Sequence, residues 1–298
     1  MASIFNKKSI LVVVVVLVVI SCMQLFYACK TTAMSALSPD PNFHIYLCFG
    51  QSNMEGSAPI ESEDVVPDDR FLLLQAMDCP NLDREQGEWY PAVPPLSHCD
   101  VGLSPADAFG KHMLGALPST VRIGVINIAV GGCDIRLFDK DQYQNYTRTW
   151  EQDWFMDKIK AYNDNPYLRL ITLARKAQQE GVIKGILLHQ GETNTGDEQW
   201  PYYVEKIYSD LLTDLNLNAS QVPLLAGETV HKEQGGVCAR MNPIINRLPE
   251  LIPTAYVISS QGCAALPDSL HFSSAGCREL GQRYAAQILT IQEQQSKD

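Results

Sequence analysis

The chain has 298 residues, of which 46% are hydrophobic and 19% are charged, and its formal net charge is −11. This composition favours one large folded domain over two and argues against disorder away from the two ends. The acidic balance disfavours nucleic acid, anionic lipid and polyanionic polymers as partners, so we expect a neutral or weakly charged substrate.

Residues 1–36 have the features of an export signal followed by a short linker. Two lysines precede an apolar run over residues 10–20, which is too short to span a membrane comfortably. Three outcomes fit this segment: a lipid anchor on Cys22, ordinary signal cleavage further along, or an uncleaved N-terminal anchor. Each predicts a secreted, periplasmic or surface-anchored protein that contacts the membrane through this end alone. Residues 37–298 are then expected to form a single domain.

Five apolar, β-branched runs, each bounded by turn residues, predict strands that are buried on both faces of a parallel sheet. They cover residues 43–49, 121–130, 183–189, 222–226 and 255–259. Helical patterns fill most of the intervals, over residues 105–117, 167–180, 202–215, 238–248 and 274–294. The alternation predicts an α/β fold with helices on both faces of a sheet of about five strands. In such sheets, ligands bind at the carboxyl ends of the strands.

Three stretches depart from this alternation, namely residues 57–104, 137–166 and 227–237. Long insertions in an otherwise compact domain are usually functional. The second stretch is rich in aromatic residues, among them Trp150 and Trp154. These side chains either stack on sugar rings or pack together as a surface lobe, and the sequence leaves both interpretations open.

Seven cysteines lie beyond the export signal, and an exported protein can form disulfides. Cys79 and Cys99 bracket a loop-like stretch and are the first expected pair. Cys263 and Cys277 flank another predicted loop and are the second. The odd count leaves at least one free thiol. We expect no metal site, because the sequence contains no Cys-x-x-Cys pair.

Four polar motifs follow predicted strands. They are Gly-Gln-Ser-Asn-Met at 50–54, Gly-Gly at 131–132, His-Gln-Gly-Glu at 189–192 and Asp-Ser-Leu-His at 268–271. If the sheet is parallel, all four loops converge on one edge. A nucleophile, oxyanion donors and a base must meet at one such place.

The residue types in these motifs suit nucleophilic catalysis. Ser52 is a weak nucleophile unless a base takes its proton, and its alternative role is to cap a helix. Asp268 stands three residues before His271, where a carboxylate can orient the imidazole through Nδ1 and leave Nε2 for the serine. One of the paired glycines and the Gln190 amide are candidate oxyanion donors. Glu192 either forms a buried pair with His189 or shares the acid role.

Taken together and in this order, the four motifs resemble the carbohydrate-esterase branch of the SGNH hydrolases. This branch is the sialate O-acetylesterase and acetyl xylan esterase group, or carbohydrate esterase family 6. The resemblance extends over residues 43–271. It implies a flavodoxin-like three-layer α/β/α fold, no cofactor, and removal of acetyl groups from an acetylated oligo- or polysaccharide.

The resemblance also implies roles by position. Ser52 becomes the nucleophile, His271 the base and Asp268 the orienting acid, with Glu192 as the alternative acid. The implied oxyanion hole consists of the backbone N–H groups of Ser52 and Gly132 and the Gln190 side chain. The residues implied to bind substrate are Gln51, Asn53 and His189. Cys133 departs from the Ser or Thr expected after the glycine pair.

Two other functions remain open at this point. One is a non-catalytic carbohydrate-binding surface protein on the same fold, and the other is a thioesterase or lipase of the same superfamily. Within the esterase interpretation, acetylated plant-wall xylan or pectin and acetylated sialic acid are both possible substrates.

Overall fold

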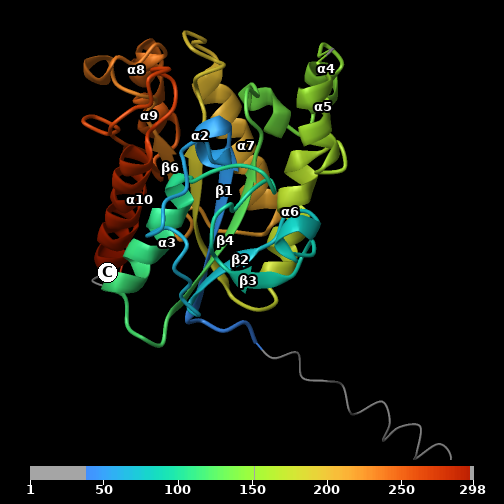
Figure 1. Ribbon diagram of the computed structural model, residues 1–298, viewed down its shortest axis with the longest axis vertical. Helices are drawn as coiled ribbons and strands as arrows, with labels where there is room; N and C mark the ends of the chain where they lie inside the picture. The colour runs from blue at the N-terminus through green and yellow to red at the C-terminus, as the bar shows by residue number, and fades with distance from the viewer. Residues whose placement is uncertain (1–37, 151, 296–298) are drawn as a thin grey trace, which may run out of the picture. The chain divides into compact units, whose positions relative to one another are not determined.

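The computed structural model describes residues 38–150 and 152–295 (Figure 1). The chain divides after Ser38, and residues 39–298 form one compact unit. The predictions made for residues 1–36, including lipidation at Cys22, lie outside the described residues. Within the described ranges, no helix combines the length and apolar character needed to cross a membrane.

A seven-stranded sheet with the order β3-β2-β4-β1-β5-β6-β7 forms the centre of this unit. β1 (Phe43–Gly50) lies between β4 (Arg122–Ala129) and β5 (Val182–His189), and it is parallel to both. β6 (Leu224–Gly227) and β7 (Ala255–Ile258) extend the parallel sheet beyond β5. These five strands correspond to the five predicted runs.

Two further strands correct the expected count of about five. β2 (Phe71–Leu74) pairs with β4 in parallel, and β3 (Trp89–Pro91) pairs with β2 in an antiparallel manner. Both lie inside the 57–104 stretch, which appeared to be a loop because its apolar runs are short and are separated by Pro, Asp and Gly. The pairing places the Trp89 ring 4.9 Å from that of Phe43, which covers the start of β1.

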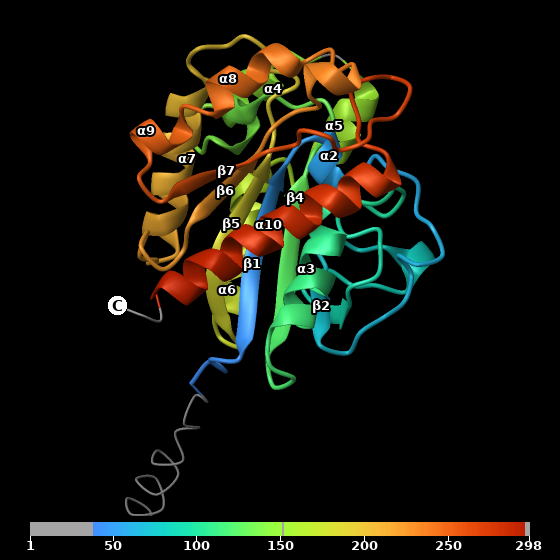
Figure 2. The ribbon, with the colours of Figure 1, turned by 90° about the vertical axis from the view of Figure 1, so that its left-hand side faces the viewer.

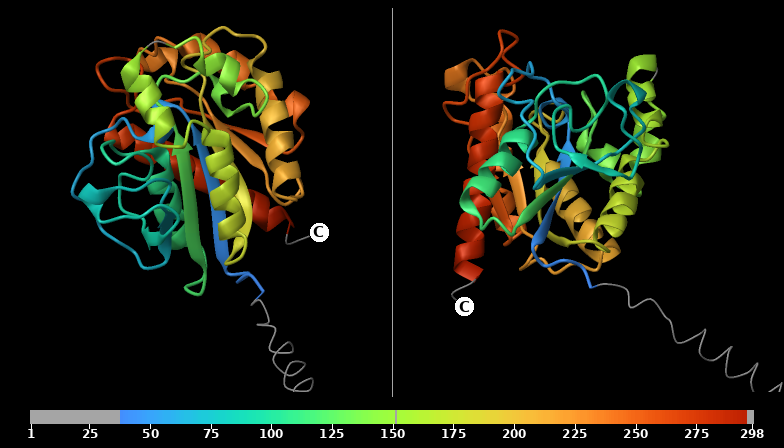
Figure 3. Two further views of the ribbon diagram at one scale, coloured as in Figure 1. Left: turned by 90° about the vertical axis from the view of Figure 1, so that its right-hand side faces the viewer. Right: turned by 60° about the horizontal axis from the view of Figure 1, so that its bottom comes forward.

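Helices cover both faces of the sheet, so the predicted three-layer α/β/α fold is confirmed. α3 (Pro105–Ala116) and α10 (Ser274–Gln295) pack together on one face (Figure 2). α6 (Pro166–Ala177) and α7 (Trp200–Asp214) cover the other (Figure 3). A separate apolar cluster fills the space on each side of the sheet.

The residues of β1 alternate between the two clusters. Ile45 and Leu47 pack under α6 and α7, whereas Tyr46 and Cys48 pack under α3 and α10. A strand with buried residues on both faces requires apolar residues at successive positions, which explains the continuous apolar run.

The helix predicted over residues 238–248 is wrong. This segment instead forms three short pieces, η4 (Ala239–Met241), α8 (Asn242–Ile245) and α9 (Leu248–Leu251). Pro243 and Pro249 each stand in the first turn of a new piece, where the absent N–H is tolerated. A proline inside one continuous helix would instead remove a hydrogen bond and clash with the preceding turn.

The remaining short elements surround the carboxyl end of the sheet or lie in the insertions. They are α2 (Ser52–Glu55), η1 (Pro80–Leu82), η2 (Ile135–Phe138), α4 (Tyr143–Thr147), α5 (Asp153–Lys160) and η3 (Lys232–Gln234). α4 and α5 form the aromatic insertion and lie on the right of Figure 1, at the same end of the sheet as α2.

One of the two expected disulfides is present. Cys79 and Cys99 are joined, which confirms the first pair. The second pair is wrong, because Cys263 and Cys277 are both buried free thiols. The Cys277 sulfur points toward the carbonyl oxygen of Leu103, 3.8 Å away, so this residue of α10 faces the core. Burial raises the pKa of Cys263 to about 11, which makes this thiol unreactive at neutral pH.

We predict that the double substitution Cys79→Ser/Cys99→Ser lowers the free energy of unfolding by about 3 kcal/mol. The disulfide closes a loop with a sequence separation of 20. Closing a loop of this size lowers the conformational entropy of the unfolded chain, which destabilises the unfolded state by about 3 kcal/mol. Urea unfolding under oxidising conditions measures the change. Wild-type protein with reductant is the control and should show the same loss. A wild-type curve that is unaffected by reductant would contradict the prediction.

Candidate active site

The four predicted motifs meet at the carboxyl edge of the sheet, around a cavity of about 420 Å³. This volume lies within the range of small-molecule sites. Each motif contributes to the wall through Ser52, Gly132, Glu192 or His271. The expected convergence of these loops is therefore present in the fold.

Ser52 is the first residue of α2, directly after the end of β1. The turn depends on Gly50, whose φ is +149° and where a Cβ would collide with the carbonyl oxygen of His189 on the neighbouring strand. Gln51, not Ser52, occupies the N-cap position of α2. The serine hydroxyl is therefore not used as a helix cap and is available to its partner across the cavity.

That partner is His271. Its Nε2 lies 2.9 Å from Ser52 Oγ, and its Nδ1 lies 2.7 Å from Asp268 Oδ2. Asp268 Oδ1 accepts hydrogen bonds from the backbone N–H groups of Leu270 and His271, at 2.9 and 3.0 Å. Burial opposes ionisation of Asp268, but the N–H and the ring of His271 hold the pKa of this carboxyl below its ordinary value. The structure thus brings together the serine, histidine and aspartate that the sequence singled out.

Asn53 connects the nucleophile helix to the histidine loop. It is fully buried, and its Nδ2 donates to Glu192 Oε1 at 2.6 Å and to the Leu270 carbonyl at 3.3 Å. Its Oδ1 accepts from the backbone N–H of Phe272 at 3.1 Å. The prediction that Asn53 binds substrate is therefore corrected, because its amide is committed on both sides within the protein.

Glu192 contacts Asn53 and not His271. Its Oε1 also lies 3.5 Å from His189 Nε2, and both side chains are buried. Burial opposes ionisation of Glu192, yet the His189 ring and the Asn53 amide hold its pKa below the ordinary value. Of the two interpretations of this residue, the geometry supports the buried pair that shapes the loop. The carboxylate next to the His271 ring is that of Asp268.

His189 and Gln190 both turn away from the cavity, which corrects two further predictions. The His189 ring is fully buried and packs edge-on against Phe272. The Gln190 NH₂ group donates toward Gln51 Oε1, Cys133 O and Asn194 Oδ1, and its carbonyl accepts from the Trp200 indole. An amide with two protons and three acceptors around it has none left for a substrate oxyanion.

The backbone N–H groups of Ser52 and Gly132 remain free for a ligand oxygen. Gly132 lines the cavity beside Ser52 with a φ of +79°, which explains why glycine stands there. Within residues 38–150 and 152–295, nothing accepts a hydrogen bond from the N–H of Ser52 or of Gly132. Gln51 also lines the cavity, with its side-chain oxygen held by Gln190 and by the N–H of Thr193 at 3.2 Å.

The comparison with protein families agrees with this geometry. Residues 42–290 match the model of the family described as carbohydrate esterase, sialic acid-specific acetylesterase. The chain belongs to this family. It is accordingly a carboxylic ester hydrolase, and the expected relationship to carbohydrate esterases is confirmed.

Solved structures share the fold of this esterase. A protein of Arabidopsis thaliana is 20% identical, with a TM-score of 0.64, over 84% of this chain and 99% of its own. NanS is 16% identical, with a TM-score of 0.63, over 87% and 99%. A carbohydrate acetylesterase from Xanthomonas citri is 18% identical, with a TM-score of 0.55, over 81% of this chain and 55% of its own.

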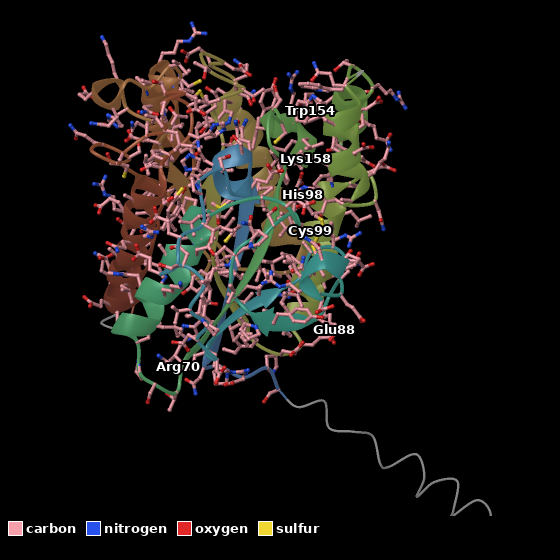
Figure 4. The ribbon with its side chains drawn as sticks, viewed as in Figure 1. Arg70, Glu88, His98, Cys99, Trp154 and Lys158 are labelled. Atoms are coloured by element: carbon pink, nitrogen blue, oxygen red, sulfur yellow. A yellow bond between two sulfur atoms is a disulfide. The ribbon has the colours of Figure 1, made fainter. Side chains whose placement is uncertain are left out.

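One charged pair in the wall of the esterase cavity was not predicted from the sequence. Glu55 ends α2, is buried, and lies 2.6 Å from Lys158 Nζ of α5. Glu55 also accepts from the N–H of Gly131 at 3.0 Å, and His98 Nε2 lies 3.7 Å away. Figure 4 shows Lys158 and His98 between α2 and α5. The position of Glu55 next to the serine motif was a usable signal for its place in the cavity wall. Its pairing with Lys158 was not predictable, because Lys158 lies in the irregular stretch over residues 137–166.

We predict that Asp268→Asn lowers kcat by about 10²–10⁴, because it removes the charge that orients the imidazole and stabilises its protonated form. In contrast, Glu192→Gln should lower kcat by less than about tenfold while lowering the free energy of unfolding by about 1–3 kcal/mol, because a buried hydrogen-bonded charge is lost. The assays are p-nitrophenyl acetate hydrolysis and urea unfolding. An equal loss of kcat in a folded Glu192→Gln variant would show that this carboxylate acts on His271.

We also predict that Lys158→Met lowers the free energy of unfolding by about 1–3 kcal/mol, because it leaves the Glu55 carboxylate buried without its cation. Urea unfolding at neutral pH measures the loss. Lys160→Met is the matched control, since Lys160 pairs with Asp157 on the exposed side of the same helix and should change stability by less than about 1 kcal/mol. Equal effects of the two substitutions would contradict a special role of the buried pair.

Proposed function

We propose that this esterase removes O-acetyl groups from carbohydrates through an acyl-enzyme intermediate on Ser52. The observation that carries the proposal is the continuous hydrogen-bonded chain from Ser52 Oγ through His271 to Asp268, at 2.9 and 2.7 Å, in the wall of a small cavity. A serine becomes nucleophilic when a histidine that is oriented by a carboxylate accepts its proton.

In the first half-reaction, Ser52 Oγ attacks the acetyl carbonyl carbon while His271 Nε2 takes the hydroxyl proton. The carbonyl oxygen becomes an oxyanion beside the free N–H groups of Ser52 and Gly132. The bond between the acetyl carbon and the sugar oxygen then breaks, and the imidazolium returns its proton to that oxygen. Asp268, ionised at neutral pH, stabilises the imidazolium during this step.

In the second half-reaction, His271 takes a proton from water, and the hydroxide attacks the acetyl-serine carbonyl. Collapse of the tetrahedral intermediate breaks the bond to Ser52 Oγ, and the histidine returns the proton to the serine. Acetate leaves and the starting state is restored. We assign the Gln51 amide, whose oxygen is already held by Gln190 and Thr193, to contact with the bound substrate.

The charges around the cavity favour a neutral sugar as the carrier of the acetyl group. Among the residues that the structure describes, Lys158 is the one lysine or arginine in the cavity wall, and it is engaged with both oxygens of Glu55. Glu192 adds a further negative charge. A carboxylated sugar would therefore meet no unpaired cation at the cavity wall, whereas a neutral acetylated sugar such as a xylan unit carries no such penalty.

The direct test is acetate release by wild type and Ser52→Ala from p-nitrophenyl acetate, acetylated xylo-oligosaccharide and an O-acetylated sialoside. We predict that Ser52→Ala lowers turnover by about 10⁴ or more on every acetyl ester that the wild type cleaves, because the nucleophile is lost. Ser57→Ala is the matched control: Ser57 lines the same cavity but donates its hydroxyl to the Ser52 carbonyl, so turnover should change by less than about tenfold.

The same panel, extended with a long-chain acyl ester, separates this proposal from its rivals. Absent acetate release would indicate a non-catalytic carbohydrate-binding protein, and release that persists in Ser52→Ala would show that Ser52 is not the nucleophile. Activity on long-chain acyl esters without activity on acetylated sugars would indicate a lipase or thioesterase. A higher kcat/KM for the sialoside than for the xylo-oligosaccharide would overturn the preference for a neutral sugar and leave the serine mechanism intact.

We also infer that the protein is exported. The Cys79–Cys99 disulfide supports this, since structural disulfides form and persist in oxidising compartments, and it agrees with the apolar run over residues 10–20. Fractionation of cells that express the full chain and its Cys22→Ala variant tests the inference. Full-length protein in the cytosol with reduced Cys79 and Cys99 would refute export, and release of the variant alone into the medium would identify Cys22 as the anchor.

A further inference from the structure

A second cavity, of about 510 Å³, adjoins the catalytic one. Thr193 lines both cavities, and its hydroxyl donates to the carbonyl of Gly132 at 3.1 Å. The two spaces therefore meet at the loop that carries the free N–H of Gly132. The other wall of the second cavity comes from α4 and the residues that follow it, in the aromatic insertion.

The groups around the second cavity suit a sugar ring. The side-chain amides of Gln142 and Asn145 provide donors and acceptors, and Tyr146 and Trp150 provide aromatic rings. The hydroxyls of Thr149 and Thr193 donate to backbone carbonyls, so their oxygens provide acceptors. A sugar has hydroxyls around its edge and an apolar C–H face, so it needs polar groups beside it and an aromatic ring against that face.

The cavity is built rigidly. The Trp150 ring stacks on fully buried Phe155, with centroids 4.2 Å apart. The Tyr146 hydroxyl accepts the backbone N–H of Asp134 at 2.9 Å. Both rings are thus held by the core before any ligand arrives, and a ligand that binds there does not have to order them.

The cavity is also balanced in charge. Arg136 donates two hydrogen bonds to Asp134, from Nε at 2.8 Å and from Nη2 at 2.6 Å. Asp134 is buried and also accepts from Asn194 Nδ2 at 2.8 Å. Because the guanidinium is already paired in this two-point manner, it offers little attraction to an anionic ligand. A neutral polyol is therefore the better match.

An exposed indole stands at the junction with the catalytic cavity. Trp154 is 52% exposed, and a Cβ on Gly132 would lie 3.2 Å from its Cη2 atom. Figure 4 shows Trp154 on the same side as Lys158, between α2 and α5. Large exposed aromatic rings beside a binding site serve as platforms for ligand rings.

We propose that the second cavity is a subsite for the neighbouring sugar of a neutral oligosaccharide whose acetylated unit lies over Ser52. In this arrangement Asn145 hydrogen-bonds the neighbouring sugar and Trp150 packs against its face. Trp154 contacts the acetylated unit itself. This proposal rests on the proposed function, and it makes the enzyme one that recognises a chain of sugars instead of a single acetylated sugar.

Asn145→Ala tests the subsite directly. Asn145 is exposed, and within the described part of the chain its side chain makes no hydrogen bond, so its removal should leave the fold intact. We expect kcat/KM for acetylated xylotriose to fall about tenfold, as for the loss of one good hydrogen bond, with acetylated methyl xyloside and p-nitrophenyl acetate within twofold of wild type. Gln144→Ala, on the same helix but outside the cavity, is the control and should change none of the three.

Trp154→Ala provides an independent readout. It should lower kcat/KM for both acetylated sugars by about tenfold and leave p-nitrophenyl acetate within twofold of wild type, and Trp154→Phe should restore most of the loss. Equal losses on all three substrates, or no loss on xylotriose in Asn145→Ala, would overturn the subsite.

A failure of the proposed function gives a different pattern. In that case wild type would cleave p-nitrophenyl acetate but release no acetate from any sugar. The subsite would then be decided by calorimetric titration of unacetylated xylotriose into Ser52→Ala, with and without Asn145→Ala. Binding that the second substitution weakens supports the subsite, and absent or unchanged binding refutes it.

Discussion

The buried amide of Asn53 sets the distance between Ser52 and His271, the proposed nucleophile and base. Ser52 and His271 stand 219 residues apart in the chain, yet they meet at 2.9 Å. Asn53 follows the nucleophile directly and is bonded to Glu192, to the Leu270 carbonyl and to the N–H of Phe272. Because the last two residues flank the histidine, α2 and the histidine loop are held as one unit. Hydrogen bonds in a low-dielectric interior are stronger than solvent-exposed ones, so the buried Asn53 amide holds this geometry firmly.

The strand order provides the frame for that contact. β1 lies between β4 and β5, so the serine loop has the glycine loop on one side and the His-Gln-Gly-Glu loop on the other. Parallel pairing carries all three to the same edge. Gly50 then allows the end of β1 to approach His189 more closely than any side chain would permit. The catalytic cavity is thus a consequence of topology together with one missing Cβ.

Much of the fold was predictable because strands buried on both faces must be continuously apolar. β2 was not, since a four-residue strand leaves too short a pattern to separate it from a loop. The positions of the site motifs were predictable for the same reason as the strands. The direction in which their side chains point was not predictable. Asn53 and Gln190 look like ligand-binding amides in the sequence, yet both are buried and hydrogen-bond to other parts of the protein. A polar residue after a strand can face the cavity or support its neighbour, and that choice depends on contacts with distant segments such as the one that supplies Lys158.

The Glu55–Lys158 pair connects the aromatic insertion to the proposed catalytic loops. Glu55 lies three residues after Ser52 and accepts the N–H of Gly131, so it holds α2 against the Gly131–Gly132 loop. Its cation comes from α5, the helix that also presents Trp154 beside Gly132. The insertion is therefore fixed against the proposed catalytic loops by a partly buried ion pair, and its remaining residues are free to shape the second cavity. A rigid sheet supplies the reacting groups, and a single inserted segment can set which sugar reaches them without altering the serine–histidine geometry.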